Sequence, residues 1–309
     1  MTAVPIEITG DADTVGVLVA RGLPDGLDAG LRDRLAPLLE SGELRGDRAE
    51  ALVVHGSPRI VAAGLGPRGQ VDAERLRTAA GAAAQALARV GGSLAWRLDP
   101  SLPVPLAEQA AALVEGTVLG GYSPGAWKTQ EPERAPRAVD RIAFAEQEVQ
   151  EAAERAALLA ERANRARDLA NMPPNELTPH VLGEKAKELA REHEHLTCDV
   201  LATRELDELG MGALTAVGRG SRNEPRLIVL RYEPPEARDG IVLGFVGKSI
   251  TFDTGGISLK PGAKMEDMKG DMAGGAGTLH GIGAIAALKL PVRAIALLAA
   301  AENMPGGDA

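Results

Sequence analysis

Short apolar runs alternate with helical patterns along most of this chain, and this alternation constrains the fold more than any other feature. The runs typical of buried strands in the first half are 14–20, 51–55, 59–65, 93–97 and 138–145. Apolar residues recur at helical spacing between them, at 27–39, 72–90 and 106–118. Strands separated by helices predict a layered α/β fold with a largely parallel sheet.

The alternation resumes in the second half of the chain. A helix is predicted at 178–191, because Thr178 is a favourable N-cap and Pro179 occupies the first helical turn. The other predicted elements are a small-residue helix at 270–288 and strands at 197–201, 226–232, 241–246 and 292–299. The run at 241–246 is apolar throughout, which is typical of a central parallel strand.

The segment between the two sets of predicted strands and helices indicates the domain organisation. Residues 121–137 are dominated by glycine, proline and charge, which indicates a loop or linker. Residues 146–170 predict one long helix that ends before Pro173, because proline cannot continue a helix. We expect two α/β domains, each with a mostly parallel or mixed sheet flanked by helices. Their predicted bounds are an N-terminal domain at 1–145, a linker helix at 146–172 and a second domain at 173–309.

Composition argues against several classes of protein. The chain has 43 acidic and 34 basic residues and a net charge of −9, so nucleic acid is an unlikely partner. The single Cys198 rules out an internal disulfide, and we expect it to be a small buried hydrophobe in a strand. The first residues do not resemble a signal peptide, and the longest apolar run, 294–301, is too short to cross a bilayer. These features favour a cytoplasmic protein with no membrane partner.

Glycine density indicates where a functional site lies. Residues 240–283 contain 12 of the 37 glycines, and glycine is used where the backbone turns with positive φ or approaches another group closely. Eight charged residues are interleaved with them: Lys248, Asp253, Lys260, Lys264, Glu266, Asp267, Lys269 and Asp271. Because this run follows a predicted strand, the charges are expected at the carboxyl end of the sheet, where open α/β folds bind ligands.

Two kinds of chemistry are compatible with this run. Gly247-Lys248-Ser249 resembles the end of a phosphate-binding loop, but Val242 stands where that motif requires glycine, and no helix is predicted directly after it. A metal site is the stronger hypothesis, because the carboxylates of Asp253 and Asp271 suit Mg²⁺, Mn²⁺ or Zn²⁺. The neighbouring lysines would either coordinate a metal as neutral amines or polarise a substrate carbonyl as ammonium groups.

Three blocks of sequence resemble one known family. The segment VGKSITFDTGGISLKPGAKMEDMKGDMAGGAGTL at 246–279 closely resembles the metal-binding signature of the leucyl aminopeptidases, also called cytosol aminopeptidases. LANMPPNELTP at 169–179 resembles the opening of that family's catalytic domain, and AENMPGG at 301–307 resembles a third block. The resemblance is strong from about residue 165 and loose before it, and it implies that the domain at 173–309 is part of a catalytic domain.

The resemblance also implies roles for individual residues. Lys248 matches a lysine whose neutral amine binds the more tightly held of two metals, and Asp271 matches the aspartate that completes the same metal's shell. Asp253 resembles the aspartate that bridges the two metals or contacts the exchangeable one. Lys260 matches the charged catalytic lysine that stabilises the oxyanion, and Met268 lies where the family lines the pocket for the N-terminal side chain. A flexible thioether there suits leucine-like side chains.

The implied activity is removal of N-terminal, leucine-like residues from peptides by a homo-hexamer with two divalent ions per site. Mn²⁺ or Zn²⁺ is expected, and Mg²⁺ is possible. The family's second signature, an Asn-Thr-Asp-Ala-Glu-Gly-Arg block with two further carboxylate ligands, is absent from the 309 residues. We therefore expect a chain truncated at its C-terminus, inactive or nearly so, that binds at most one divalent ion weakly. The alternative is a non-catalytic fragment that acts as a binding or scaffold subunit.

Three histidines and one glutamate lie outside these matches. His280 lies on the predicted helix at 270–288 and is expected to be structural rather than a ligand. His193 and His195 lie in a charged stretch and are expected on the surface. Glu302 follows the predicted strand at 292–299, and both a place beside the site and a structural role stay open for it.

Overall fold

The computed structural model describes residues 3–127, 138–238 and 240–306. The chain divides into two compact units, Met1–Glu161 and Arg162–Ala309, and the division falls inside the long helix α4 (Gln150–Asn171). The first half of α4 packs into the core of the first unit, and its last turns pack into the core of the second. The helix predicted at 146–170 is therefore present. The predicted loop at 121–137 lies mostly outside the described residues.

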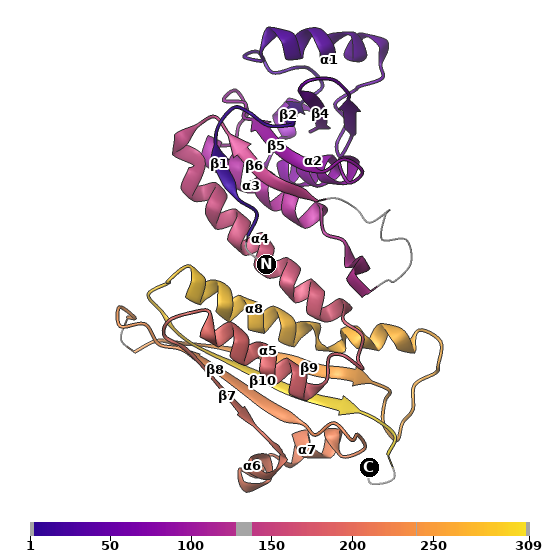
Figure 1. Ribbon diagram of the computed structural model, residues 1–309, viewed down its shortest axis with the longest axis vertical. Helices are drawn as coiled ribbons and strands as arrows, with labels where there is room; N and C mark the ends of the chain where they lie inside the picture. Colours follow the sequence, from indigo (N-terminus) through magenta and orange to yellow (C-terminus); the bar gives the residue numbers. More distant parts are fainter. Residues whose placement is uncertain (1–2, 128–137, 239, 307–309) are drawn as a thin grey trace. The chain divides into compact units, whose positions relative to one another are not determined.

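The first unit is built on a six-stranded sheet of order β1-β6-β5-β2-β4-β3 (Figure 1). Its strands are β1 (Ile6–Ile8), β2 (Thr14–Val19), β3 (Ala51–Val54), β4 (Arg59–Gly64), β5 (Gly92–Arg97) and β6 (Val139–Phe144). All neighbouring strands are parallel except β3, which runs antiparallel to β4. Every strand except β1 was predicted, because three residues carry too little apolar pattern to stand out.

Helices cover both faces of this sheet. They are α1 (Ala29–Ser41), α2 (Ala73–Ala86) and α3 (Leu106–Gly120), each overlapping a predicted helix. Side chains of successive strand residues point to opposite faces. Leu18 and Trp96 accordingly belong to the larger core with α2 and α3, whereas Val17 belongs to the smaller core with α1. The first unit is thus a three-layer α/β domain.

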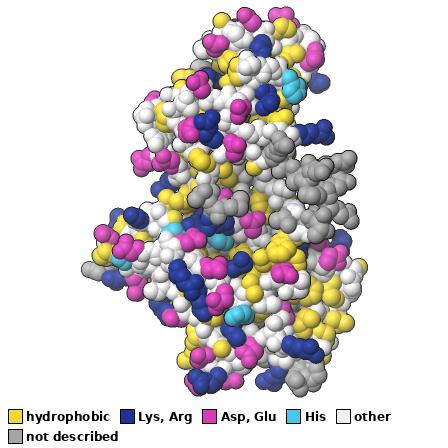
Figure 2. All heavy atoms as spheres, in the orientation of Figure 1, with side chains coloured by type: hydrophobic (Ala, Val, Ile, Leu, Met, Phe, Trp, Pro, Cys, Tyr) yellow, Lys and Arg dark blue, Asp and Glu magenta, His cyan; other side chains and the backbone are white. Residues whose placement is uncertain are grey.

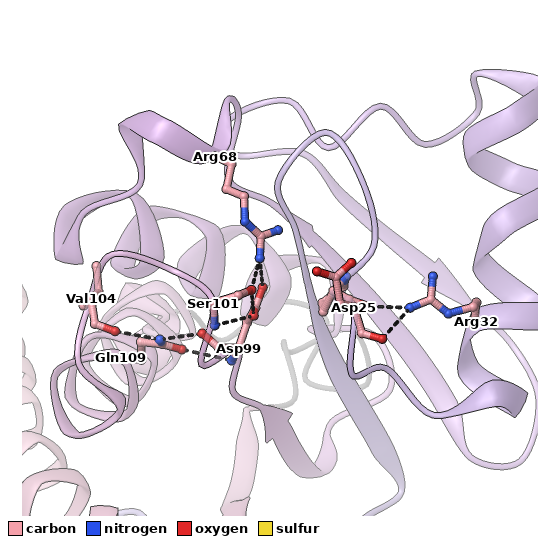
Figure 3. A network of polar contacts seen from close by, with 8 residues as sticks. Asp25, Arg32, Arg68, Asp99, Ser101, Val104 and Gln109 are labelled. Atoms are coloured by element: carbon pink, nitrogen blue, oxygen red, sulfur yellow. Dashed lines mark hydrogen bonds and ion pairs between the residues drawn. The ribbon is translucent and has the colours of Figure 1, made fainter.

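A polar network closes the loop that follows β5 (Figure 3). Arg68 forms an ion pair of 2.8 Å with Oδ2 of the buried Asp99 and also hydrogen-bonds Ser101. The buried carboxamide of Gln109 donates to the backbone carbonyls of Asp99 and Val104. These bonds satisfy polar groups that would otherwise be buried without partners, which gives the network a structural role.

The second unit has a four-stranded mixed sheet of order β7-β8-β10-β9. Its strands are β7 (Leu196–Leu201), β8 (Arg226–Tyr232), β9 (Val242–Asp253) and β10 (Arg293–Asn303). β8 runs antiparallel to both β7 and β10, whereas β9 runs parallel to β10. Helices α5 (Pro179–Arg191) and α8 (Ala273–Ala287) pack together with alternate residues of β10 in one core on the same face of the sheet (Figure 1).

The predicted central position of the strand at 241–246 is wrong. β9 lies at the edge of the sheet and, among the described residues, pairs only with β10. Its apolar side chains are exposed, with Val246 at 79 % and Val242 at 60 %. Figure 2 shows hydrophobic side chains exposed among charged ones on the surface of this unit. An apolar run predicts a strand that packs against other segments. The run does not specify which strands lie beside it or which segments pack on it.

The remaining helices of the second unit are short and were not predicted. They are α6 (Thr203–Glu208) and α7 (Gly212–Gly218), followed along the chain by the 3₁₀ helix η5 (Met265–Met272). The helix predicted at 270–288 therefore starts as a 3₁₀ turn and becomes α-helical at Ala273. Within the described ranges, no helix has the length and apolar character needed to cross a membrane.

Candidate metal centre

The register between β9 and β10 brings Lys248 and Asp253 to the same face of the sheet. Residues five apart in a regular strand point to opposite faces. The pairing with β10 skips Thr251, which is an extra residue on β9, so the alternation shifts by one. Lys248 pairs with Ala299 and Asp253 pairs with Asn303, four residues further along β10. Both side chains therefore leave β9 on one face near its carboxyl end.

Two lysine–carboxylate ion pairs form at this end of the strand. Lys248 Nζ lies 2.8 Å from Asp271 Oδ1, and Lys260 Nζ lies 2.5 Å from Asp253 Oδ2. Met268 is beside the second pair, with its Sδ 3.3 Å from Lys260 Nζ. The structure therefore groups the five residues selected from the sequence into a Lys248–Asp271 pair and a cluster of Asp253, Lys260 and Met268.

Glycine makes the turn after Asp253 possible. Gly255 and Gly256 have φ values of 93° and 66°, a region that other residues rarely adopt. The chain then folds back, so that the backbone N–H of Lys260 donates to the carbonyl of Thr254 at 2.9 Å. A Cβ atom on Gly255 would lie 2.3 Å from the carbonyl oxygen of Ser258. The paired glycines of the sequence thus bring Lys260 back to the strand end that carries Asp253.

The carboxylate of Asp253 is held at both oxygens. Oδ1 accepts hydrogen bonds from the backbone N–H of Gly255 at 2.9 Å and from Asn303 Nδ2 at 2.7 Å. Oδ2 accepts from Lys260. Burial acts to raise the pKa of Asp253, but the hydrogen bonds from Lys260, Gly255 and Asn303 outweigh it and hold the pKa below its ordinary value. Asp253 is therefore an ionised, fixed carboxylate.

Asp271 has one carboxylate oxygen that receives no hydrogen bond from the described residues. Oδ1 pairs with Lys248, whereas Oδ2 is buried and has no hydrogen-bond partner among the described residues. Asp271 lies in η5, directly before helix α8. Helix α8 packs closely on β9, because a Cβ atom on Gly275 would lie only 2.0 Å from Ser249 Oγ. A buried carboxylate oxygen without a donor is costly unless a cation or another donor compensates it.

These donors fit a divalent cation in part. Asp253 and Asp271 supply hard oxygen ligands, and the amine of Lys248 supplies a nitrogen ligand when it is deprotonated. The described residues contain no group of three or more His, Cys, Asp or Glu side chains placed to hold a metal. The chain as described therefore offers donors for one cation and too few for a complete two-metal site.

The other charged residues of η5 do not belong to these pairs. Glu266, Asp267 and Lys269 line a cavity of about 300 Å³ together with Pro173, Pro174 and Phe252. A 3₁₀ helix has three residues per turn, so Met268 shares a face with Asp271 and not with Lys269. The segment predicted to open the catalytic domain thus contributes two prolines to a cavity lined by η5.

Asn303 is the contact that the sequence analysis missed. Its neighbour Glu302, for which a place beside the site stayed open, is buried and accepts hydrogen bonds from Ser221 at 2.6 Å and Asn223 at 2.9 Å. Glu302 therefore anchors a loop, whereas Asn303 contacts Asp253 directly. The parallel pairing of β9 with β10 was the missing information, because it places the ends of the two strands side by side.

The histidines and the cysteine have structural surroundings. His193 was expected on the surface, which is wrong, because its side chain is 14 % exposed and its Nε2 lies 2.7 Å from Arg162. Burial lowers the pKa of His280 to about 4, and its Nδ1 has no hydrogen-bond partner in the part of the chain that is described. Cys198 is half-buried on β7, and burial raises the pKa of its thiol to about 11.

The fold and this donor set are compatible with a metal-dependent enzyme. Fixed carboxylates at the carboxyl end of an α/β sheet lie where such folds bind ligands, and their oxygens suit a catalytic divalent ion. Two family models agree: the catalytic domain of the cytosol aminopeptidase family matches residues 164–309, and the N-terminal domain of the same family matches residues 15–131. The chain belongs to the cytosol aminopeptidase family.

Curated relatives carry the same family name. A probable cytosol aminopeptidase of Roseiflexus castenholzii is 38 % identical over 320 residues, which cover 99 % of this chain and 63 % of the relative. A probable cytosol aminopeptidase of Desulfovibrio desulfuricans is 42 % identical over 289 residues, which cover 89 % of this chain and 57 % of the relative. This chain therefore spans about three fifths of the length of such relatives.

Solved structures have the same fold. The bottromycin maturation enzyme BotP in complex with Mn matches with a TM-score of 0.80 and 31 % identity, over all of this chain and 61 % of that one. A tomato leucine aminopeptidase mutant matches with a TM-score of 0.82 over 100 % of this chain and 64 % of that one. Its identity of 23 % supports the fold alone. The mixed α/β architecture with two sheets is therefore that of leucine aminopeptidases.

Proposed function

We propose that this chain carries part of the active site of an aminopeptidase that releases N-terminal, preferably leucine-like, residues from peptides. The observation that carries the proposal is the pair of lysine–carboxylate contacts at the carboxyl end of β9, with a buried Asp271 oxygen that has no donor among the described residues. Membership of the family supports the reaction type. The relatives are longer than this chain, so the activity of a whole enzyme is part of the proposal.

The residues that would hold a divalent ion are Asp253, Asp271 and Lys248. A complete site would take two such ions, Mn²⁺ or Zn²⁺ with Mg²⁺ possible, and the Mn complex of BotP supports a divalent ion of this kind. Metal of this type polarises a peptide carbonyl and lowers the pKa of a bound water. Lys248 must lose its proton to bind, so its ion pair with Asp271 would be replaced when the site fills.

Lys260 and Met268 would act on the substrate itself. The ammonium of Lys260 is held at the strand end by Asp253 and can donate to a developing oxyanion placed beside it. The Met268 thioether lies next to that ammonium and offers an adaptable apolar wall for the side chain of the leaving residue. The two residues would thus couple charge stabilisation to recognition of the N-terminal side chain.

A second candidate function is that of a non-catalytic binding or scaffold subunit. Such a subunit would need no complete metal site, and the described residues contain no group of three or more His, Cys, Asp or Glu side chains placed to hold a metal. Under either proposal we place the protein in the cytoplasm. Under the aminopeptidase proposal the complete protein would be a homo-hexamer with peptides as substrates. The 309-residue chain alone is then inactive or nearly so, and it binds at most one divalent ion weakly.

The test is hydrolysis of a chromogenic leucine anilide with Mn²⁺ added. It compares the purified chain with a version extended through an Asn-Thr-Asp-Ala-Glu-Gly-Arg block. We expect turnover in the extended version, its loss in Asp253→Ala, and little change in the matched control Asp267→Ala, which alters an acid of the neighbouring cavity. Folded extended protein that turns over no anilide would refute the aminopeptidase proposal. Clear turnover by the 309-residue chain would refute its expected inactivity.

A further inference from the structure

Asn303 connects β10, an inner strand of the second unit, to the candidate site. It is the last residue of β10, and its Nδ2 donates to Asp253 Oδ1 at 2.7 Å. Its backbone carbonyl accepts from the N–H of Thr254 at 3.0 Å and from Thr254 Oγ1 at 2.7 Å. One residue thus holds both the side chain of Asp253 and the backbone that follows it.

The orientation of the Asn303 carboxamide is determined by its surroundings. An ionised carboxylate only accepts hydrogen bonds, so the amide nitrogen must face Asp253. The amide oxygen then faces Gly256, where a Cβ atom would lie only 2.4 Å from it. Gly256 has a φ of 66° and leaves room for that oxygen. The turn glycine and the strand-end asparagine therefore fit each other and keep the amide from rotating freely.

This arrangement makes the two oxygens of Asp253 unequal. Oδ1 receives two N–H donors, from Gly255 and Asn303, and so uses the lone pairs it has for strong hydrogen bonds. Oδ2 has only the Lys260 ammonium as a donor among the described residues. Oδ2, on the side of Lys260, is therefore the oxygen of Asp253 that still has lone pairs available to coordinate a cation.

We propose that Asn303 is a positioning residue, which holds Asp253 so that Oδ2 is the oxygen presented to the metal. The inference rests on the proposed metal centre and assigns a role to a residue outside the donor set. Hydrogen bonds that orient ligating carboxylates are a large part of metal affinity, and their removal commonly weakens it about 10- to 100-fold. Loss of the Asn303 amide removes one of the two donors to Oδ1 and leaves only Gly255 on that oxygen, so the orientation of the Asp253 carboxylate is less firmly fixed.

The chain contains a matched control at the same strand end. Asn223 also donates from a side-chain amide to a carboxylate, that of Glu302, at 2.9 and 3.0 Å. Glu302 is adjacent to Asn303 in sequence, but it is hydrogen-bonded to Ser221 and Asn223 and not to Asp253. Removal of either amide deletes the same chemical group, but only one deletion touches the candidate ligand.

The experiment measures Mn²⁺ binding to the purified chain by calorimetry and by electron paramagnetic resonance of the free ion. Asp253→Asn defines the share of binding that belongs to this site. We expect Asn303→Ala and the similarly shaped Asn303→Leu to weaken that share about tenfold or more, and Asn223→Ala to leave it within about twofold. We also expect Mn²⁺ to raise the melting temperature of the wild type, and this increase to shrink in the Asn303 variants.

Each outcome decides the inference. Wild-type affinity in both folded Asn303 variants would overturn it and leave the proposed function intact. An equal loss in Asn223→Ala would mean that the strand end was merely loosened, which also overturns it. A wild-type chain that binds no Mn²⁺ at millimolar concentration would remove both this inference and the metal centre proposed for the chain. Failure of both Asn303 variants to fold would make Asn303 a purely structural residue.

Discussion

The carboxylate of Asp253 is held by groups from three segments of the chain. Gly255 contacts it from the turn, Lys260 from the returning loop and Asn303 from the neighbouring strand. The first two lie within seven residues of Asp253, whereas Asn303 lies 50 residues away. Lys260 was selected from the sequence as a site residue, but none of the three contacts was predicted, and the one with Asn303 required knowledge of which strands are neighbours.

His280 is the residue with the clearest pH dependence. Burial, with smaller contributions from Arg162, Arg165 and Lys185, lowers its pKa from 6.5 to about 4. Between these values the unfolded chain binds a proton that the folded chain does not, so the free energy of unfolding falls as the pH falls. We expect His280 to account for a loss of about 2 kcal/mol between pH 7 and pH 5.

Urea unfolding at both pH values checks this, with His280→Gln as the comparison. The variant should lose less stability between pH 7 and pH 5 than the wild type does. Burial also lowers the pKa of His193, which contributes a loss of the same sign in both proteins. Parallel curves for wild type and variant would show that His280 does not titrate as expected.

At the scale of elements, glycine lets helix α8 approach strand β9 closely. A Cβ atom on Gly247 would lie 2.6 Å from the Cα of Gly275, and one on Gly275 would lie 2.0 Å from Ser249 Oγ. This contact sets the distance between Lys248 on β9 and Asp271, which lies just before α8. The small residues in the predicted helix at 270–288 therefore allow close packing against β9. The helical periodicity alone did not predict this contact.

Two alanine substitutions on α8 should have opposite effects. Gly275→Ala forces the helix away from β9 and is expected to destabilise the protein by about 1–3 kcal/mol and to weaken Mn²⁺ binding. Gly277→Ala has nothing within 4 Å of the new Cβ atom, so the better helix propensity of alanine should stabilise by up to about 1 kcal/mol. Urea unfolding measures both changes, and equal effects of the two substitutions would contradict this account of the contact.

At the scale of the whole molecule, β9 presents an apolar edge. Val242, Leu243, Phe245 and Val246 are exposed, and the described residues pair only one side of the strand. Edges of this kind are templates for pairing with another strand. The net charge of −9 opposes association of copies in general, but it acts over the whole surface and not at this edge.

We expect Val246→Lys to reduce self-association of the chain at high concentration. Val246 is 79 % exposed, so the substitution should leave the unfolding free energy nearly unchanged. Val217→Lys, at an exposed position on α7 away from the edge, is the control for added charge. Light scattering across a concentration series measures the effect. Equal reductions by both variants would assign the association to net charge and not to the β9 edge.

Much of the fold follows from local pattern. The N-cap at Thr178 is present as predicted, with its side chain accepting from the Val181 N–H, because capping depends on residues within one turn. Most strands and helices likewise begin within a few residues of their predicted starts. The short elements β1, α6 and α7 were missed, because a strand of three residues and a helix of two turns or fewer carry little periodicity.

The sequence by itself determined the α/β class, the family and the five residues grouped at the site, because these depend on residue types at short spacing. Only the tertiary structure decided that β9 is an edge strand, that Thr251 shifts Lys248 and Asp253 onto one face, and that Asn303 holds Asp253. Strand order and register arise from pairing between segments far apart in the chain. The free energy of such pairing depends on the side chains of both strands, so it cannot be predicted from either segment alone.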